Sequence, residues 1–298
     1  MVTISMTPAP AQQATPPEYP PAISGARVET YKKTVGEVEL KVWLFNPEGH
    51  SGDNRRPAII FFFGGGWNRG NPRQFANHCE YLAARGMVAI TADYRVRDRH
   101  AVKANACVSD AKSAIRWVRQ NATRLGIDPD RIAAGGGSSG GHLAAATATL
   151  PEHDDPAEDR TVSSQPNALV LFNPGVILAP VPERWQPDQD AFDKFKERLG
   201  AEPVTMSPYH HIETGMAPTI IFHGTADKLV PYESVALFRE AMLARNNRCD
   251  LIGYKGAGHG FFNYGRDENA AFIDTVNKMD AFLVSVGYLK PPPETVSP

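Results

Sequence analysis

The sequence predicts an α/β fold in which a mostly parallel, twisted sheet is covered by helices on both faces. The first observation behind this is the continuous apolar run Ala58–Phe63, which is typical of a strand buried on both sides. The second is that similar runs alternate along the chain with longer segments of helical pattern. The third is the composition: the 298 residues are 42% hydrophobic and 21% charged, which is ordinary for a globular chain of this length.

The elements follow in order from the N-terminus. Strands are expected at Arg27–Thr34 and Glu37–Phe45, where polar and apolar residues alternate as in a half-exposed antiparallel pair. After Ala58–Phe63, the expected strands are Met87–Asp93, Arg131–Gly135, Ala168–Phe172, Thr219–His223 and Asp250–Tyr254, and the expected helices are Arg73–Arg85, Ala104–Leu125, Ser138–Leu150, Tyr232–Arg245 and Glu268–Val286.

Residues 175–215 interrupt this alternation between two sheet strands. They contain several prolines, a tryptophan and the amphipathic stretch Ala191–Leu199, so we interpret them as a cap or pocket insertion within one domain, residues 25–290. Residues 1–24, rich in Pro, Ala, Gln and Thr, are expected to be a disordered leader, and residues 291–298 a disordered tail. The leader shows no basic and apolar signal-peptide regions, although a processed remnant of an exported protein remains an alternative.

Charge and cysteine content narrow the classes of function. A formal net charge of −2 gives no electrostatic reason to expect nucleic acid or an anionic membrane as a partner. No run approaches the roughly 18 apolar residues of a membrane-spanning helix. Cys79, Cys107 and Cys249 suggest buried free thiols rather than a disulfide framework, with a Cys79–Cys107 bridge left open. Neither a metal nor another cofactor is expected, because no clustered ligand set is visible.

A candidate nucleophile lies where an apolar strand runs into a helix. Gly136-Gly137-Ser138-Ser139-Gly140 places G-x-S-x-G in a sharp turn, which projects a serine hydroxyl above the sheet. The helix N-terminus behind it offers backbone N–H groups and a positive dipole to a developing oxyanion. Ser139 also satisfies the pattern in a shifted register. We choose Ser138, three residues after Gly135, and expect the Ser139 amide to donate to the oxyanion.

Three further segments supply the remaining parts of a hydrolytic site. Gly64-Gly65-Gly66 follows the first long apolar strand, where consecutive glycines let backbone N–H groups face an active site. His259 lies in a glycine-rich loop between the last expected strand and helix, and Asp227 lies in a turn after Thr219–His223. The order Ser138, Asp227, His259 predicts a nucleophile, an acid and a base, respectively. The other histidines are expected to be structural.

Taken together, these motifs resemble one family. They are Gly64-Gly65-Gly66-Trp67, Asp93-Tyr94-Arg95, Gly137-Ser138-Ser139-Gly140-Gly141-His142, His223-Gly224 with Asp227, and Gly258-His259-Gly260-Phe261. The chain is similar, from about Tyr31 to Leu289, to α/β-hydrolase-fold esterases akin to hormone-sensitive-lipase-like carboxylesterases and bacterial acetylxylan or feruloyl esterases. The resemblance implies an oxyanion hole of Gly65, Gly66 and Ser139, and structural roles for Asp93, Tyr94, Arg95, Asp110 and Trp117.

One departure and several alternatives accompany the resemblance. Many relatives carry His where this chain has Phe63, which bears on how the glycine loop is held. Relatives with Phe there often act on acetylated plant polysaccharide such as xylan, so a short-chain ester of a sugar or small alcohol is the expected substrate. Trp67, Trp185 and Phe261 are candidates for its pocket. A general carboxylesterase or feruloyl esterase, a prolyl-oligopeptidase-like peptidase and a non-catalytic binding protein on this scaffold are the alternatives.

Overall fold

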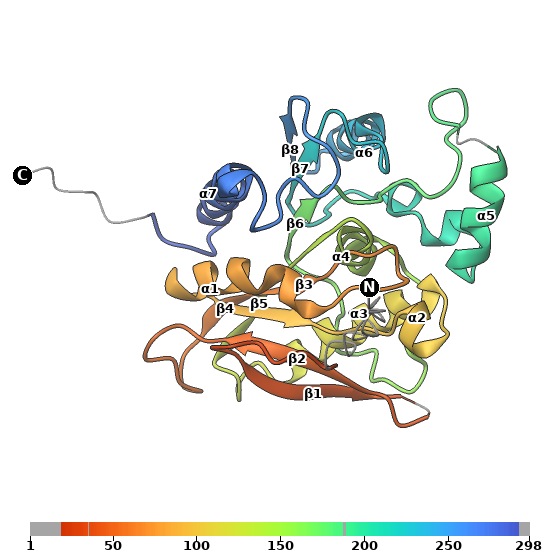
Figure 1. The fold of residues 1–298 in the computed structure, drawn as a ribbon. Coiled ribbons are helices and arrows are strands. Elements are labelled where there is room, and N and C mark those ends of the chain that lie inside the picture. Colours follow the sequence, from red (N-terminus) through yellow and green to blue (C-terminus); the bar gives the residue numbers. More distant parts are fainter. Residues whose placement is uncertain (1–18, 35, 187–188, 292–298) are drawn as a thin grey trace, which may run out of the picture.

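The computed structural model describes residues 19–34, 36–186 and 189–291, in which eight strands form one sheet (Figure 1). The strands are β1 (Arg27–Lys33), β2 (Glu39–Phe45), β3 (Arg56–Phe62), β4 (Val88–Ala92), β5 (Ile127–Gly137), β6 (Ala168–Phe172), β7 (Thr219–Gly224) and β8 (Cys249–Tyr254). Their order across the sheet is β1-β2-β4-β3-β5-β6-β7-β8. Only the β1–β2 and β2–β4 pairs are antiparallel, so the predicted mostly parallel α/β sheet is confirmed.

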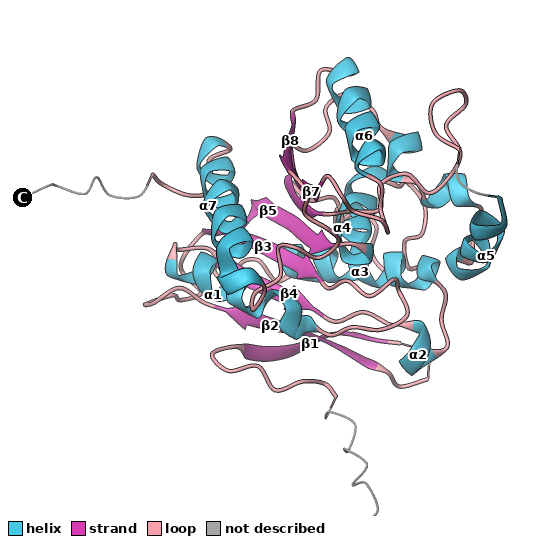
Figure 2. Cartoon of the chain, turned by 45° about the horizontal axis from the view of Figure 1, so that its top comes forward, coloured by secondary structure: helices cyan, strands magenta, loops and turns pink. Residues whose placement is uncertain are grey.

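Helices cover both faces of this sheet. They are η1 (Pro72–Phe75), α1 (Ala76–Ala84), α2 (Arg97–His100), α3 (Ala104–Gln120), α4 (Ser139–Thr149), α5 (Gln189–Leu199), η2 (Pro203–Met206), η3 (Pro208–His211), α6 (Tyr232–Ala244), η4 (Asp267–Asn269) and α7 (Ala270–Ser285), where η marks a 3₁₀ helix. Figure 2 shows α1 and α7 on one side of the sheet and α3, α4 and α6 on the other. Of the described helices, none is long and apolar enough to cross a membrane.

The core divides into two clusters because side chains alternate along each strand. In β3, Ala58, Ile60 and Phe62 join the cluster beneath α3 and α4, whereas Ile59 and Phe61 join the one beneath α1 and α7. All five are fully buried. A strand covered on both sides has no polar face, which is why β3 appears in the sequence as an uninterrupted apolar run.

Several predicted boundaries were wrong at element ends. The expected helix Arg73–Arg85 begins as η1, and α1 starts only at Ala76. The expected helix Ala104–Leu125 ends at Gln120, because turns follow that are closed by Leu125 N–H on Asn121 O and Ile127 N–H on Ala122 O. These turns lead directly into β5, which starts at Ile127 and is therefore longer than expected.

The segment preceding β1 differs from the expected disordered leader where it is described. The Trp43 indole donates to Pro21 O at 3.1 Å, and the Arg73 guanidinium donates to Ala22 O at 3.0 Å. Arg99 donates to the Tyr19 hydroxyl at 2.8 Å. Composition cannot reveal such specific partners, so the prediction was wrong for residues 19–24. Residues 1–18 and 292–298 lie outside the described residues.

The three cysteines are buried free thiols, as predicted. Cys79 in α1 belongs to the core cluster on one face of the sheet, and Cys107 in α3 belongs to the cluster on the other face. The sheet therefore separates them, and the Cys79–Cys107 bridge that the sequence left open is not formed.

Candidate active site

Ser138 lies at the junction between β5, in the middle of the sheet, and α4. Its backbone has φ 55° and ψ −119°, a region that a serine adopts only at a cost of about 1–3 kcal/mol. Two hydrogen bonds hold this turn: Ser138 N–H donates to Phe172 O at 2.9 Å, and His142 N–H donates to Ser138 O at 2.9 Å. The strained turn points the Ser138 hydroxyl out of the sheet toward the cavity.

Close backbone contact makes this junction depend on glycine. A Cβ on Gly140 would lie 2.0 Å from Phe62 O, at the end of the neighbouring strand β3. Rigid backbone on both sides leaves no room for a methyl group. The glycines of the G-x-S-x-G pattern therefore let α4 start close against the sheet.

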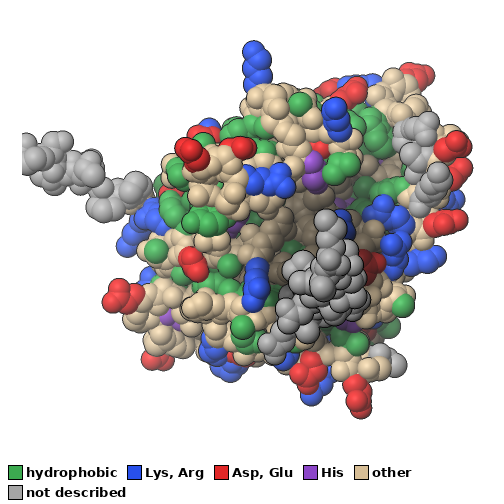
Figure 3. Space-filling view, viewed as in Figure 1, with side chains coloured by type: hydrophobic (Ala, Val, Ile, Leu, Met, Phe, Trp, Pro, Cys, Tyr) green, Lys and Arg blue, Asp and Glu red, His purple; other side chains and the backbone are tan. Residues whose placement is uncertain are grey.

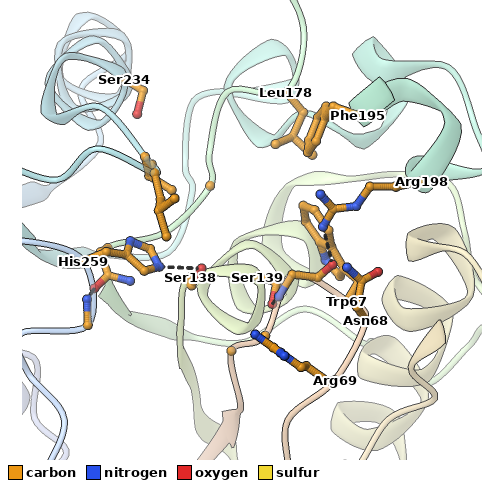
Figure 4. Close-up of a pocket in the computed structure, with 18 of the residues that line it drawn as sticks. Trp67, Asn68, Arg69, Ser138, Ser139, Leu178, Phe195, Arg198, Ser234 and His259 are labelled. Carbon is orange, nitrogen blue, oxygen red and sulfur yellow. Dashed lines mark hydrogen bonds between the residues drawn. The ribbon is translucent and has the colours of Figure 1, made fainter. Parts of the chain in front are cut away.

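His259 and Asp227 complete a hydrogen-bonded chain with Ser138. His259 Nε2 lies 2.9 Å from Ser138 Oγ, and His259 Nδ1 lies 2.7 Å from Asp227 Oδ2 (Figure 4 shows the former). Asp227 is 7% exposed, and its Oδ1 accepts from Leu229 N–H at 2.9 Å and Val230 N–H at 3.0 Å. These bonds fix the carboxylate so that its other oxygen faces the imidazole, which is the geometry that Ser–His–Asp catalysis requires.

The structure gives two neighbouring histidines structural positions. His142 in α4 accepts from the Trp67 indole at 3.3 Å and lies 2.8 Å from Met206 O, and burial lowers its pKa to about 4. His223 at the end of β7 lies 2.8 Å from Val230 O, and burial lowers its pKa as well. Both rings stay neutral at pH 7 and neither touches Ser138.

The glycine loop after β3 presents the amide groups expected of an oxyanion hole. Gly65 has φ 135°, and a Cβ there would lie 2.0 Å from Arg69 O, so only glycine fits. Neither the Gly65 nor the Ser139 N–H has an acceptor among the described residues. Gly66 differs from the prediction, because its N–H donates to Ser139 Oγ at 2.9 Å.

Phe63 holds this loop from below. Its ring stacks on Tyr94 with centroids 4.1 Å apart, and the Tyr94 hydroxyl donates to Phe63 O at 2.6 Å. Both side chains are fully buried. Tyr94 therefore has the structural role predicted for it. An aromatic stack therefore positions the glycine loop in this chain.

Sequence reasoning missed three polar residues that tie the loops together. Gln74 accepts from Gly64 N–H at 2.6 Å and donates to Asn263 Oδ1 at 2.9 Å. Asn173 Oδ1 accepts from Gly260 N–H at 3.0 Å. The glycine loop and the His259 loop are thus joined by side-chain amides. Local sequence gives no signal for this, since each partner comes from a distant segment.

A cavity of about 770 Å³ opens above Ser138, within the usual range for small-molecule sites. In Figure 3 it appears as the hollow near the centre of the molecule. Trp67 and Trp185 line it, and α5 contributes Phe192, Phe195 and Arg198. The predicted insertion 175–215 therefore forms one wall of the pocket.

The prediction for Phe261 was wrong. Phe261 is 6% exposed and packs against Tyr254, with ring centroids 4.6 Å apart, whereas Phe262 lines the cavity. The side chains of adjacent residues after a turn point in different directions, and the sequence does not reveal which one faces the substrate. Within residues 19–34, 36–186 and 189–291, no group of three or more His, Cys, Asp or Glu is placed to hold a metal ion.

Comparison with known proteins agrees with this geometry. The BD-FAE family model matches residues 44–242. Esterase LipC of Mycobacterium tuberculosis is 30% identical over 222 residues, and the match covers 69% of this chain and 53% of LipC. Carboxylesterase NlhH of the same species is 28% identical, with 85% of this chain and 80% of NlhH covered. The chain spans about half the length of LipC and of the probable carboxylic ester hydrolase LipM, at 53% and 44%.

Solved structures of one bacterial enzyme are closer. Thermogutta terrifontis esterase 2 phosphonylated by sarin is 54% identical, with a TM-score of 0.89, and the match covers 92% of this chain and 100% of that one. The propionate-bound form of the same esterase is also 54% identical, with a TM-score of 0.87 and coverage of 92% and 99%. The chain therefore belongs to the BD-FAE family of α/β-hydrolase-fold proteins, whose relatives named above are esterases.

Proposed function

We propose that this protein is a serine carboxylesterase that works through an acyl-enzyme. The observation that carries the proposal is the continuous chain from Ser138 Oγ through His259 to Asp227, with distances of 2.9 and 2.7 Å. These atoms come from three separate loops at the carboxyl ends of β5, β7 and β8. Ligand sites in open parallel sheets lie at this edge.

The mechanism follows from the positions of these groups. His259 Nε2 accepts the Ser138 hydroxyl proton as Oγ attacks the ester carbonyl, and the bound Asp227 carboxylate stabilises the imidazolium that forms. The imidazolium then protonates the leaving alcohol, so that the acyl group remains on Ser138. Water attacks the acyl-enzyme with His259 again as base, and the acid product leaves.

The amides of Gly65 and Ser139 are proposed to stabilise the oxyanion. Both residues line the cavity beside Ser138, and neither N–H group has an acceptor among the described residues. Removing one such donor typically costs on the order of a hundredfold or more in rate. The Gly66 amide adds a third donor when the Ser139 hydroxyl turns away from it.

The proposed substrates are esters of short acyl groups. Support comes from the Thermogutta terrifontis esterase, whose solved forms include propionate-bound and butyrate-bound ones. Acetyl esters of a sugar or other small alcohol fit this range, and acetylated plant polysaccharide such as xylan is the finer proposal that Phe63 favours. A pocket lined by Trp67, Trp185 and Phe195 offers apolar surfaces on which a sugar ring or short chain can pack.

The test is turnover of p-nitrophenyl acetate, butyrate and octanoate, with acetylated xylan and methyl ferulate alongside and Ser138→Ala as the blank. Strong acetate and butyrate turnover with weak octanoate turnover is expected. Release of acetate from xylan supports the polysaccharide proposal, and its absence restricts the enzyme to small esters. A lack of Ser138-dependent turnover on every ester refutes the esterase proposal and directs attention to peptides or to a non-catalytic scaffold.

A further inference from the structure

The wall of the catalytic cavity is rich in basic side chains. Of the described residues that line the cavity, four are arginines (Arg69, Arg97, Arg198 and Arg266) and one is a carboxylate, Asp98. Arg266 lies on the His259 side, where it donates to His259 O at 3.4 Å. In Figure 3, basic side chains gather along the right-hand rim of the hollow. The chain as a whole has a net charge of −2, so this excess of positive charge is local to the cavity. Such a wall favours an anion over a neutral ligand.

Arg198, from α5, lies deepest in this wall. One terminal nitrogen donates to Gly66 O at 2.7 Å, and the guanidinium carbon lies 5.9 Å from the centre of the Trp67 ring and 6.0 Å from that of Phe195. Its Nε is buried and has no hydrogen-bond partner among the described residues, and none of the ion pairs between described residues includes Arg198. A half-buried cation without a counter-charge is costly, and an anionic ligand would supply the missing partner.

Arg97 extends the same wall from the short helix α2. Two backbone hydrogen bonds attach α2 to the glycine loop, from Arg97 N–H to Trp67 O at 3.0 Å and from Asp98 N–H to Asn68 O at 2.9 Å. Burial lowers the pKa of Arg198, and the positive charge of nearby Arg97 lowers it further by a smaller amount. Asp98 lies 3.6 Å from Arg97, and both side chains are more than half exposed. The Asp98 carboxylate therefore pairs with Arg97 near the surface and does not balance the positive charge of Arg198.

The position of His259 indicates which part of an ester meets these arginines. The leaving alcohol has to lie within reach of His259 Nε2, because that atom protonates it. Figure 4 shows His259 on one side of Ser138 and Ser139, and Trp67, Phe195 and Arg198 on the other. The acyl chain of a bound ester therefore extends toward Arg198, across the apolar surfaces of Trp67 and Phe195.

We propose that Arg198, assisted by Arg97, forms a subsite for a carboxylate at the far end of the acyl group. The substrates would be half-esters of short dicarboxylic acids, such as succinate and glutarate, whose methylene groups pack on Trp67 and Phe195. This inference rests on the proposed esterase function and specifies its substrate class. A charge-assisted hydrogen bond to a guanidinium should improve kcat/KM by about tenfold or more over a neutral group of the same shape.

The test compares pairs of esters matched in shape by pH-stat titration. Ethyl hydrogen succinate is set against ethyl levulinate, in which a methyl ketone replaces the carboxylate, and ethyl hydrogen glutarate against ethyl 5-oxohexanoate. Wild-type protein is expected to prefer one anionic member by about tenfold in kcat/KM, mainly through KM. Arg198→Met should lower kcat/KM for the anionic ester about tenfold more than for its neutral partner, so that the preference is lost, and Arg97→Gln should reduce the preference only in part.

Arg184→Gln is the matched control, since Arg184 belongs to the same insertion but pairs with Glu240 and does not line the cavity. It should leave the preference unchanged. Equal losses on both esters in Arg198→Met would show that Arg198 merely supports Gly66, and would overturn the subsite. A preference for carboxymethyl acetate over acetoxyacetone would place the anion on the alcohol side and overturn it as well. Levulinate turnover without any anionic preference refutes the subsite alone, whereas no Ser138-dependent turnover refutes the proposed function too.

Discussion

Ser138 and Ser139 illustrate how two adjacent, chemically identical side chains acquire different roles. Both fit the G-x-S-x-G pattern in the sequence. Only Ser138 reaches His259, at 2.9 Å, while the Ser139 hydroxyl accepts from Gly66 N–H. The end of β5 decides between them, because the residue that follows the strand occupies the strained turn and the next one begins α4.

Ser138→Ala should therefore abolish turnover, lowering kcat by at least about a thousandfold, since Ser138 Oγ is the one nucleophile bonded to His259 Nε2 among the described residues. Ser139→Ala should retain activity within about tenfold of wild type, because losing one hydrogen bond to Gly66 is offset by freeing that amide for the oxyanion. The measurement is kcat on p-nitrophenyl butyrate. Inactive Ser139→Ala together with active Ser138→Ala would reverse the assignment.

Gln74 is a positioning residue whose removal should act on kcat. In Gln74→Leu the Gly64 N–H loses its acceptor and Asn263 loses its donor, so the glycine loop is no longer tied to the His259 loop. An unsatisfied buried N–H costs about 1–3 kcal/mol, from which we expect a drop in kcat of about tenfold. KM should change little.

Gln74→Glu is the informative comparison, since it keeps the oxygen that accepts from Gly64. It should recover much of the lost kcat. A rise in KM with unchanged kcat in Gln74→Leu would instead mean that Gln74 contacts the substrate and does not position the loop.

At this scale the sequence predicts some site residues and not others. Ser138, Asp227 and His259 each follow a recognisable strand, so their order and local pattern identify them. The prediction that Phe261 lines the pocket was wrong, because the sequence pattern does not show which of two adjacent aromatic rings turns toward the cavity. Gln74, Asn173 and Arg198 could not be found, since their roles depend on contacts with segments 10 to 189 residues away.

Among the elements, accuracy of the predicted bounds depends on how each segment is buried and how it ends. β6 and β7 match their apolar runs to within one residue, because burial on both faces leaves a strong composition signal, whereas β3 begins two residues before its run. The ends of α1 and α3 were missed because 3₁₀ and turn hydrogen bonds replace the helical ones there, and many residue types tolerate either.

The packing of α1 against the sheet leads to a prediction about pH. His78 in α1 is fully buried among aromatic rings, including those of Phe75 and Phe272, and neither ring nitrogen has a partner among the described residues. Burial lowers its pKa to about 3. Below the unfolded pKa of about 6.5, the unfolded chain binds a proton that the folded chain does not, so stability falls as the pH decreases from about 6.5 toward 3.

His78→Phe removes this linkage and fills the site with another ring. Its advantage in free energy of unfolding over wild type should therefore grow by about 2 kcal/mol between pH 7 and pH 5. Urea unfolding of both proteins at the two pH values measures the difference. An advantage that is the same at both pH values would show that His78 takes up a proton as readily in the folded protein as in the unfolded chain.

For the whole molecule, the two-sided core explains why the fold class was predictable. Alternating strands and helices imply a parallel sheet with both faces covered, and the core clusters lie on those faces. The sequence predicted the segment that contains α5 only as an insertion and not its position in the fold, because that position depends on packing against α3 and the glycine loop. The basic character of the cavity could not be located from composition, since the four arginines come from four different segments of the chain.

Because the three cysteines are buried and unpaired, we expect the melting temperature of the protein to be the same under oxidising and reducing conditions. Cys79, Cys107 and Cys249 are all buried and unpaired, and burial raises the pKa of each thiol. A reductant should leave the melting temperature unchanged, and a thiol reagent should label three groups only after unfolding. Fast labelling of the native protein, or a lower melting temperature in reductant, would contradict this arrangement.

The distribution of the catalytic chain over the sheet also has a consequence for refolding. Ser138 and His259 are 121 residues apart in sequence, and His259 follows β8, which pairs only with β7 at the edge of the sheet. Contacts between distant segments bear the largest loop-closure entropy and tend to form late. Recovery of catalysis after dilution from denaturant would therefore mark the docking of the final strand, and would lag behind collapse of the central strands.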